Sequence, residues 1–306
     1  MAATKHSLFV VLLVISYFLV QRETTAQEGG GSDEASKIVF LVGPCSHSGG
    51  SHEAAAGARL LKRCVDQAGS GKVQTEIFYT WPEDDSCLDS AATLVFTGDV
   101  FPGERFEQSE RAMDKIGKLM EKGCGLVCFH YATGVQQRDV GEDGYHPLLD
   151  WMGGYHSAGC RHHKSRVGMY PAVEYIAADP NHPVCRGWKQ FTLPEEPYWE
   201  SYFGPSGAEG RVTAIARADL PPEAPTSQIL IWAYERKDGG RAVGFTPPHF
   251  FVNWRNDDMR TAALNSIYWT AKLEIPERGV ATQLPDLQEF QPGSVQPVKA
   301  PEWWKK

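Results

Sequence analysis

Four histidines stand shortly after apolar runs that are typical of buried strands. His47 and His52 follow the run 37–43, His130 follows 125–129, and His249 follows 241–246. Imidazole exchanges protons near neutral pH and binds divalent metals. Ligands of open parallel sheets bind beyond the carboxyl ends of the strands. The spacing therefore predicts that these rings meet at one edge of a sheet, as a centre for acid–base or metal chemistry.

Two further polar side chains belong to the same predicted edge. Asp99 follows the apolar run 92–97, and Tyr131 comes directly after His130. The stretch Pro-Glu-Glu-Pro-Tyr at 194–198 adds a second group. A carboxylate placed against an imidazole orients the ring and raises its pKa. We therefore expect an acidic partner for the histidines.

Glu195 and Glu196 are neighbours, and Tyr198 follows two residues later. Adjacent side chains point in opposite directions along an extended chain. Only one of the two carboxylates is therefore predicted to face a crevice, and the other is expected to lie in water. An exposed acidic turn is the alternative for the whole stretch.

Each candidate also has a purely structural interpretation, which the sequence leaves open. The alternatives are a first helical turn for His52, a solvated loop for His47, a hydrogen-bonded core position for His130, rigid packing for His249 and a turn for Asp99. The pair His162-His163 is expected in a solvated basic loop, and His182 in a turn. Trp151, Trp199 and Trp254 could offer flat faces to sugar rings, with core packing as the alternative.

The seven cysteines show no metal-binding or redox spacing. Their number is odd and no CxxC pair occurs, which argues against a structural zinc site. Cys124 and Cys128 lie in one predicted strand, about 13 Å apart, and cannot bridge each other. Buried thiols are expected, with room for one or two disulfides elsewhere.

The overall composition limits the class of partner. The 306 residues carry a formal charge of −8, which provides no field to hold a nucleic-acid backbone or an anionic membrane. A hydrophobic fraction of 42% is that of an ordinary globular chain. Neither nucleic acid nor, after processing, a membrane is expected as a partner, and a homo-oligomer stays open.

Predicted strands alternate with predicted helices through the first half of the chain. The strands are 37–43, 73–79, 92–97 and 125–129, and the helices are 53–67 and 104–122. This alternation predicts a parallel α/β sheet. Long loops and extra strands over one sheet edge are expected from 131 to 218. A hairpin of 229–234 and 241–246 and a helix over 259–273 then complete a domain spanning 37–274, and 275–306 is predicted to be an extended tail on the surface.

The amino-terminal segment has the pattern of a signal peptide. Thirteen apolar residues, 8–20, follow Lys5, and small residues at 24–26 suit cleavage. An α-helix needs about 20 residues to cross a bilayer. We expect residues 1–26 to be removed near Ala26, a flexible leader at 27–36, and an exported mature protein, periplasmic or secreted. An uncleaved anchor is the alternative.

The order of short motifs resembles that of the ThuA-like (trehalose-utilisation) family. The match extends from about Lys37 to Val280. The motifs are 37–42, 46–53, 123–132, 151–155, 181–187, 195–198 and 241–254. The resemblance implies a flavodoxin-like three-layer α/β sandwich, with a mostly parallel sheet and helices on both faces, related to class I glutamine amidotransferases. It also implies a role in bacterial carbohydrate catabolism.

The family motifs carry over onto particular positions of this chain. His130 matches the elbow histidine, His249 the late histidine and His52 the early one, while Glu195, Glu196 and Tyr198 match an acidic-acidic-x-Tyr motif. The acidic pair is Glu-Glu here where the family usually has Asp-Glu. A histidine expected soon after Gly-Gly-aromatic is displaced into 156–163.

Glutamine amidotransferases need a cysteine nucleophile at the elbow that His130 occupies. Cys128 lies about 6.7 Å deeper in the same strand. Glutamine hydrolysis through a thioester is therefore not expected.

The leading hypothesis is an exported enzyme that acts on a sugar or keto-glycoside. Its predicted catalytic residues are His130, Glu196, Tyr198 and His249, and its predicted substrate-binding residues are His47, His52, Asp99, Tyr131 and Trp254. No cofactor is identified, but a divalent metal would be possible if His47, His52, His130 and His249 converged on one ion. The rival hypothesis is a binding module that holds a carbohydrate or a partner without turnover.

Overall fold

The computed structural model describes residues 1, 35–157 and 159–296. Apart from Met1, the predicted signal peptide lies outside the described residues, as do residues 27–34 of the leader and the tail from residue 297. Within the described part, none of the helices combines the length and the hydrophobicity that a membrane crossing requires.

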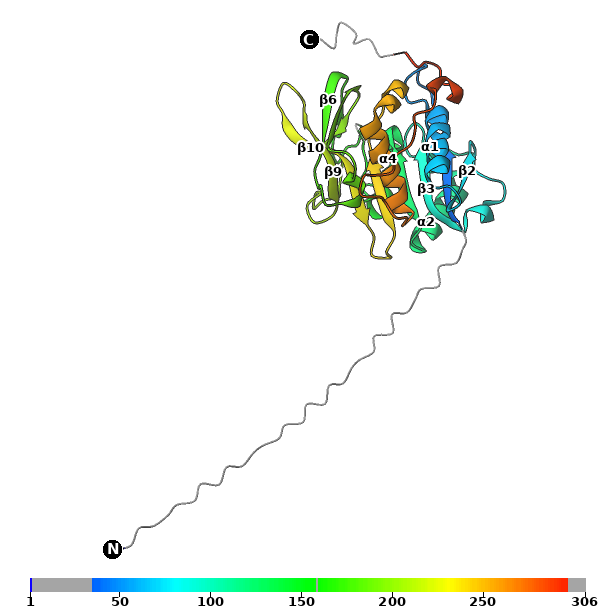
Figure 1. Cartoon of the computed structure of the whole chain (residues 1–306). Coiled ribbons are helices and arrows are strands. Elements are labelled where there is room, and N and C mark those ends of the chain that lie inside the picture. Colours follow the sequence, from blue (N-terminus) through cyan, green and yellow to red (C-terminus); the bar gives the residue numbers. More distant parts are fainter. Residues whose placement is uncertain (2–34, 158, 297–306) are drawn as a thin grey trace. The chain divides into compact units, whose positions relative to one another are not determined.

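A nine-stranded mixed sheet forms the centre of the domain (Figure 1). Its strand order is β2-β1-β3-β4-β11-β10-β9-β6-β7. The parallel half consists of β2 (Val73–Phe78), β1 (Ser36–Val42), β3 (Ala91–Thr97), β4 (Gly125–Phe129) and β11 (Arg241–Phe245). The antiparallel half consists of β10 (Thr226–Glu235), β9 (Thr213–Leu220), β6 (Tyr170–Ala177) and β7 (Gln190–Glu195). A separate pair is β5 (Arg166–Val167) with β8 (Tyr198–Trp199).

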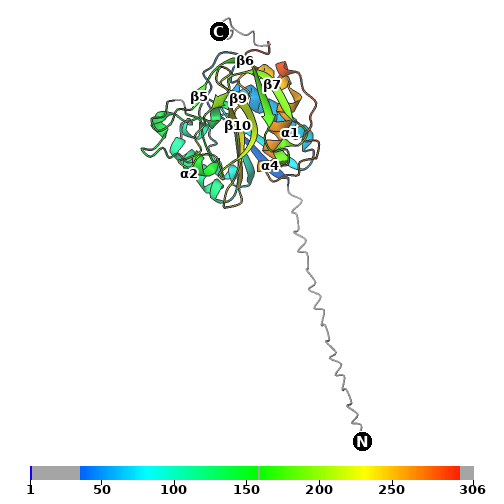
Figure 2. The same ribbon diagram turned by 90° about the vertical axis from the view of Figure 1, so that its left-hand side faces the viewer.

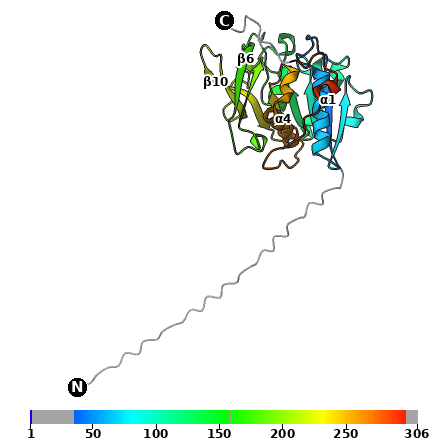
Figure 3. The same ribbon diagram turned by 45° about the horizontal axis from the view of Figure 1, so that its top comes forward.

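Helices cover both faces of the parallel half, as the flavodoxin-like α/β prediction requires. In Figure 2, α1 (Ala54–Ala68) and α4 (Asp257–Thr270) lie on one side of the sheet, and α2 (Ser109–Glu121) lies on the other. The short α3 (Leu148–Trp151) packs on the α2 side. Figure 3 shows β6 and β10 at the end of the sheet away from α1. The predicted three-layer sandwich is confirmed.

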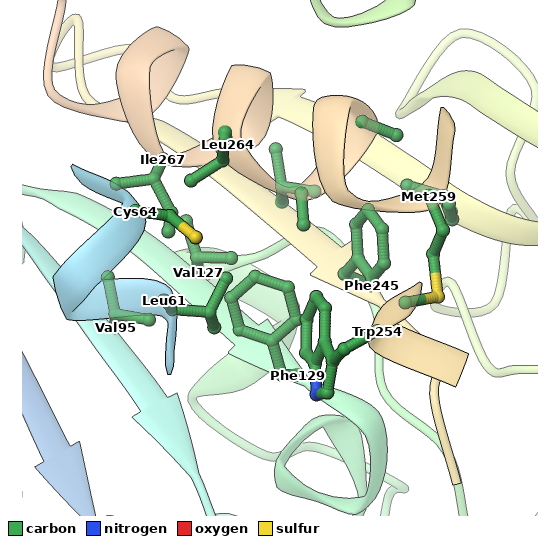
Figure 4. Close-up of a cluster of buried hydrophobic side chains, with 14 of the residues drawn as sticks. Leu61, Cys64, Val95, Val127, Phe129, Phe245, Trp254, Met259, Leu264 and Ile267 are labelled. Carbon is green, nitrogen blue, oxygen red and sulfur yellow. The ribbon is translucent and has the colours of Figure 1, made fainter. Parts of the chain in front are cut away.

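Side chains of the parallel strands alternate between two buried clusters. Phe40 faces α1 and α4, whereas its neighbour Leu41 faces the α2 side, and both are fully buried. Figure 4 shows Val95, Val127 and other strand residues packed beneath α4. Because both faces are covered, these strands have continuous apolar sequences rather than alternating ones.

The helix predicted over 104–122 is divided in the structure. A 3-10 turn occupies Pro102–Glu104, and α2 begins only at Ser109. Phe106 is buried, and the Arg105 guanidinium pairs with Asp139. These tertiary contacts hold the intervening residues out of the helix and override the local helical pattern.

The carboxyl-terminal segment is not simply laid on the surface as predicted. Leu287, Phe290 and Val295 are buried against the α1–α4 cluster. The backbone N–H of Gly293 donates a hydrogen bond to Glu53, just before α1. The red segment therefore lies beside α1 in Figure 1. The apolar side chains of this segment cause it to dock, and its docking site borders the loop that carries His52.

Candidate functional site

Two of the predicted site histidines adopt a backbone conformation that L-residues rarely take. His52 has φ of 58° and His130 has φ of 48°, and Glu53 at 32° shares this left-handed region. Each such residue costs about 1–3 kcal/mol, and such strain gathers at functional sites. At the end of β4 the left-handed turn directs His130 out of the strand direction, toward the carboxyl edge of the sheet.

Backbone hydrogen bonds join the loops that carry the histidines. The His52 N–H donates to the His249 carbonyl at 2.7 Å, and the Phe251 N–H donates to the Gly50 carbonyl at 2.9 Å. The loop after β3 joins the same group, because the Asp99 N–H donates to the Pro44 carbonyl at 2.9 Å. Three loops from distant parts of the chain therefore form one connected edge.

Four side chains meet at this edge, and we call them the histidine cluster: His52, His130, His249 and Glu196. His130 Nε2 lies 3.2 Å from His52 Nε2 and 3.2 Å from His249 Nδ1. Glu196 Oε2 lies 3.0 Å from His249 Nδ1 and 3.9 Å from His130 Nε2. One donor atom from each residue lies within 4.8 Å of all the others. The rings of His52, His130 and His249 therefore converge at one edge of the sheet, as the sequence predicts.

Hydrogen bonds on the outer side fix the orientation of two of these rings. His130 Nδ1 donates to the Thr246 carbonyl at 2.7 Å. His52 Nδ1 lies 2.6 Å from Asp99 Oδ1, and Asp99 also contacts His47 Nδ1 at 2.9 Å. Asp99 and His47 therefore belong to the outer layer of the site, and His47 stacks on the His52 ring with centroids 3.4 Å apart.

Burial and local partners set the charges of the site. Burial lowers the pKa of His130 far below its usual range. Burial also lowers the pKa of His52, although the hydrogen bond that His52 donates to Asp99 acts in the opposite direction. Burial by itself raises the pKa of Asp99, but the hydrogen bonds from His52 and Ser46 outweigh it and the net shift is downward. The site therefore combines neutral imidazoles at His52 and His130 with an ionised Asp99 at neutral pH.

The two adjacent glutamates point in opposite directions, but the expectation that one of them is in water is wrong. Glu195 is fully buried and accepts hydrogen bonds from the His249 N–H at 2.6 Å and from Asn253 Nδ2 at 3.0 Å. Burial raises the pKa of Glu195 to about 7. Burial raises the pKa of Glu196, but its hydrogen bonds with His249 and Tyr198 and the charges of the nearby imidazoles together outweigh burial, so the net shift is downward. Glu195 lies on the face of β7 that packs against protein, next to buried Leu193, and this is why it is not in water.

Tyr198 lies between two imidazole rings. Its ring stacks on His130 with centroids 4.6 Å apart and on His156 with centroids 4.3 Å apart. Its hydroxyl lies 3.1 Å from His130 Nε2, and burial raises its pKa far above the usual value. The sequence placed a family histidine only within 156–163 and did not select His156 as a site residue, although His156 directly follows the Gly-Gly-Tyr stretch.

The access side of the cluster is formed by its more exposed members. The Glu196 side chain is 21% exposed and that of His47 is 37% exposed, whereas His52, His130 and His249 are each 6% exposed or less. Tyr131 lies on this side, with its ring 5.8 Å from that of His52. A ligand would reach the imidazoles past these side chains.

Trp254 does not present a free face to a sugar. It is 4% exposed and packs against Phe129 beneath α4 (Figure 4). Its edge lines a small pocket together with His52 and His130. Trp199 is buried as well, and Trp151 packs against Phe101. The core-packing alternative is therefore correct for these tryptophans.

Three other histidines were assigned to loops from the sequence, and His162 is exposed as expected. His182 does lie in a turn, where its ring accepts a hydrogen bond from the Val184 N–H. His163 is not solvated as expected: its ring stacks on Tyr202 at 4.2 Å, and both ring nitrogens are buried without a partner among the described residues. The aromatic neighbour removes His163 from water.

All seven cysteines are free thiols, so the disulfides for which the sequence left room are absent among the described residues. Cys128 is fully buried in β4, and burial raises the pKa of its thiol far above the usual value. It therefore cannot serve as the nucleophile that an amidotransferase needs. The elbow after β4 holds the His130 imidazole instead.

A comparison with protein-family models matches residues 45–270 to ThuA, described as trehalose utilisation. This match covers the larger part of the chain, including every residue of the histidine cluster. The chain belongs to the ThuA family. A search of curated proteins found no match.

Solved structures of ThuA-like proteins share the fold. One from Bacteroides uniformis is 15% identical, with a TM-score of 0.53, and the alignment covers 77% of this chain and 91% of that one. One from Parabacteroides merdae is 13% identical, with a TM-score of 0.50, and the alignment covers 82% and 98%. A glutamine amidotransferase from Thermotoga maritima aligns at 8% identity with a TM-score of 0.44, covering 78% of this chain and 99% of that one.

Proposed function

We propose that this ThuA-family chain is an exported enzyme of carbohydrate utilisation that acts on a sugar or keto-glycoside. The family's link to trehalose utilisation supports the substrate class. The apolar segment 8–20 and the small residues at 24–26 support export. The reaction centre in this proposal is the histidine cluster.

One observation carries the proposal. Three imidazoles and a carboxylate from distant segments converge within 4.8 Å at the carboxyl edge of a parallel sheet, which is where such sheets bind ligands. The strained backbone at His52 and His130 adds support, because strain of this kind clusters at active sites and ligand-binding sites.

The site offers the groups that chemistry next to a sugar carbonyl needs. The raised pKa of Tyr198 keeps its hydroxyl protonated at neutral pH, so that it can donate a hydrogen bond to an oxygen that becomes negative. The lone pairs of the cluster face the same space and can accept a proton or a hydrogen bond from a sugar hydroxyl. Tyr131 on the access side would contact the rest of the sugar.

The test is a turnover assay on the purified chain with monosaccharides, disaccharides and their keto forms. The wild type is expected to form product, and Tyr198→Phe is expected to lower kcat about 100-fold while leaving sugar binding within a few-fold. His162→Ala, which changes an exposed histidine, is the matched control and should keep wild-type turnover.

Two results would count against the proposal. Sugar binding without product, equally strong in wild type and Tyr198→Phe, would instead identify a carbohydrate-binding module. For export, the chain is produced in a bacterial host and its amino terminus is determined by mass spectrometry. A mature terminus near Gln27 outside the cytoplasm supports export, and an intact Met1 terminus in the cytoplasm refutes it.

A further inference from the structure

We propose that the histidine cluster binds one divalent transition-metal ion, with Zn²⁺ as the best match, through His52 Nε2, His130 Nε2, His249 Nδ1 and Glu196 Oε2. This inference deepens the proposed function by naming what the reaction centre holds. Metal binding can be measured without any sugar, so the two proposals can fail separately.

The separations between the four donor atoms are those of ligands around one ion. Zinc lies about 2.0–2.2 Å from nitrogen and oxygen ligands, which places tetrahedral neighbours about 3.4 Å apart. Four of the separations within the cluster measure 3.2, 3.2, 3.0 and 3.9 Å, and all of the separations lie within 4.8 Å. A single ion can therefore reach all four atoms with only small side-chain adjustments.

The rings of His52 and His130 cannot form a hydrogen bond with each other in their neutral forms, because each carries its proton on Nδ1 and uses it for an outer acceptor. The Thr246 carbonyl can only accept, so His130 carries its hydrogen on Nδ1 and presents a lone pair at Nε2 in its neutral form. Ionised Asp99 likewise accepts from His52 Nδ1. The two Nε2 lone pairs then face each other across 3.2 Å, an arrangement that is repulsive until a cation lies between them.

The outer hydrogen bonds are those that metal-binding histidines typically make. Such a ring usually donates its second N–H to a carboxylate or a backbone carbonyl, which fixes the tautomer and the ring orientation. His52 has the carboxylate of Asp99, and His130 has the carbonyl of Thr246. His249 is held through its backbone, whose N–H donates to buried Glu195.

The charge and chemistry of the donors favour a borderline transition metal. Three imidazoles and one carboxylate suit zinc, iron, nickel or copper better than magnesium or calcium, which prefer all-oxygen sites. The carboxylates of Asp99 and Glu196 supply the negative charge that a buried cation needs. A bound ion with a further open position would polarise a sugar oxygen or lower the pKa of a water molecule.

A second group of potential ligands, Cys45, His47 and Asp99, lies next to the cluster. It is more open to solvent, and its Asp99 is already the partner of two imidazoles. We therefore assign the ion to the histidine cluster, and the experiment tests the alternative directly.

The experiment uses the purified full chain, stripped with a chelator and titrated with Zn²⁺ by calorimetry. One ion per chain is expected to bind to the wild type. Stoichiometric binding should be lost in His130→Ala and weakened strongly in Glu196→Gln, whereas His162→Ala and Cys45→Ser should bind as the wild type does. Bound Co²⁺ should also give a visible absorption spectrum that changes in Glu196→Gln, a variant that keeps the shape of the side chain.

The inference is overturned if the wild type binds none of Zn²⁺, Mn²⁺, Ni²⁺ and Co²⁺ more tightly than His130→Ala does. Loss of the ion in Cys45→Ser but not in Glu196→Gln or His130→Ala would place it at the neighbouring group and also overturn the assignment. Tight metal binding without sugar turnover would refute only the proposed function. Turnover that persists unchanged in the fully stripped chain would refute only the metal as part of the reaction.

Discussion

Glu195 Oε1 accepts the backbone N–H of His249 at 2.6 Å, so a fully buried carboxylate holds in place a residue whose ring belongs to the histidine cluster. Its other oxygen accepts from Asn253 Nδ2 at 3.0 Å. The neighbouring Glu196 contacts the ring of the same histidine. Glu195 therefore holds the backbone of His249, whereas Glu196 contacts its ring.

We predict that Glu195→Gln lowers the free energy of unfolding by about 1–2 kcal/mol, because the new amide N–H₂ faces the Asn253 amide where an acceptor is needed. Glu195→Ala should cost more, since it leaves the His249 and Glu196 N–H groups without their acceptor. Urea unfolding of both variants measures this. Equal stability of Glu195→Ala and wild type would contradict the role assigned to Glu195.

Asp99 orients His52 from outside the cluster, so we expect removal of the Asp99 carboxylate to affect mainly ligand binding. We predict that Asp99→Asn weakens Zn²⁺ binding about 10- to 100-fold, as removal of an outer carboxylate partner does at other metal-binding histidines. Calorimetric titration of the chelator-stripped chain provides the measurement. Asp89→Asn, which changes an exposed carboxylate remote from the site, is the control and should leave the affinity unchanged.

The sequence was sufficient for the parallel half of the fold and for the location of the site. Continuous apolar runs such as 37–43 and 125–129 identify strands covered on both faces, and the carboxyl-edge rule then brings His52, His130 and His249 together. Both inferences need only the local pattern of apolar residues and the order of the strands, and both can be read from a single sequence.

Features that depend on what packs against a residue were not accessible in this way. The alternation that separates Glu195 from Glu196 is local, but whether protein or water covers the second face is decided by Asn253 and the segment around it. His156 reaches Tyr198 only because two loops fold onto each other. For the same reason the sequence offered His47 rather than Glu196 as the fourth member of a metal site.

The docked carboxyl-terminal segment supports the loop that carries His47 and His52. A Cβ atom on Gly293 would lie 2.4 Å from Gly49 Cα and 2.9 Å from Glu53 Oε1. We predict that Gly293→Ala displaces this contact and weakens Zn²⁺ binding several-fold, with a loss of stability of about 1–2 kcal/mol. Gly159→Ala is the matched control, because a Cβ there meets no atom within 4 Å. Identical metal affinity in the two variants would show that the segment does not support the loop.

His163 should make the protein sensitive to acid. Burial lowers its pKa from an ordinary 6.5 to about 4. As the pH falls below about 6.5 the unfolded chain takes up a proton that the folded chain does not, so stability is lost between pH 6.5 and pH 4. We predict that His163→Phe gains about 1 kcal/mol at pH 7, because it also removes two buried nitrogens that have no partner within 35–157 and 159–296. Its advantage in Tm over the wild type should widen at pH 5.

The control is His162→Gln at the exposed neighbouring position, which should follow the wild-type curve of stability against pH. An advantage of His163→Phe that is constant with pH would rule out the linkage.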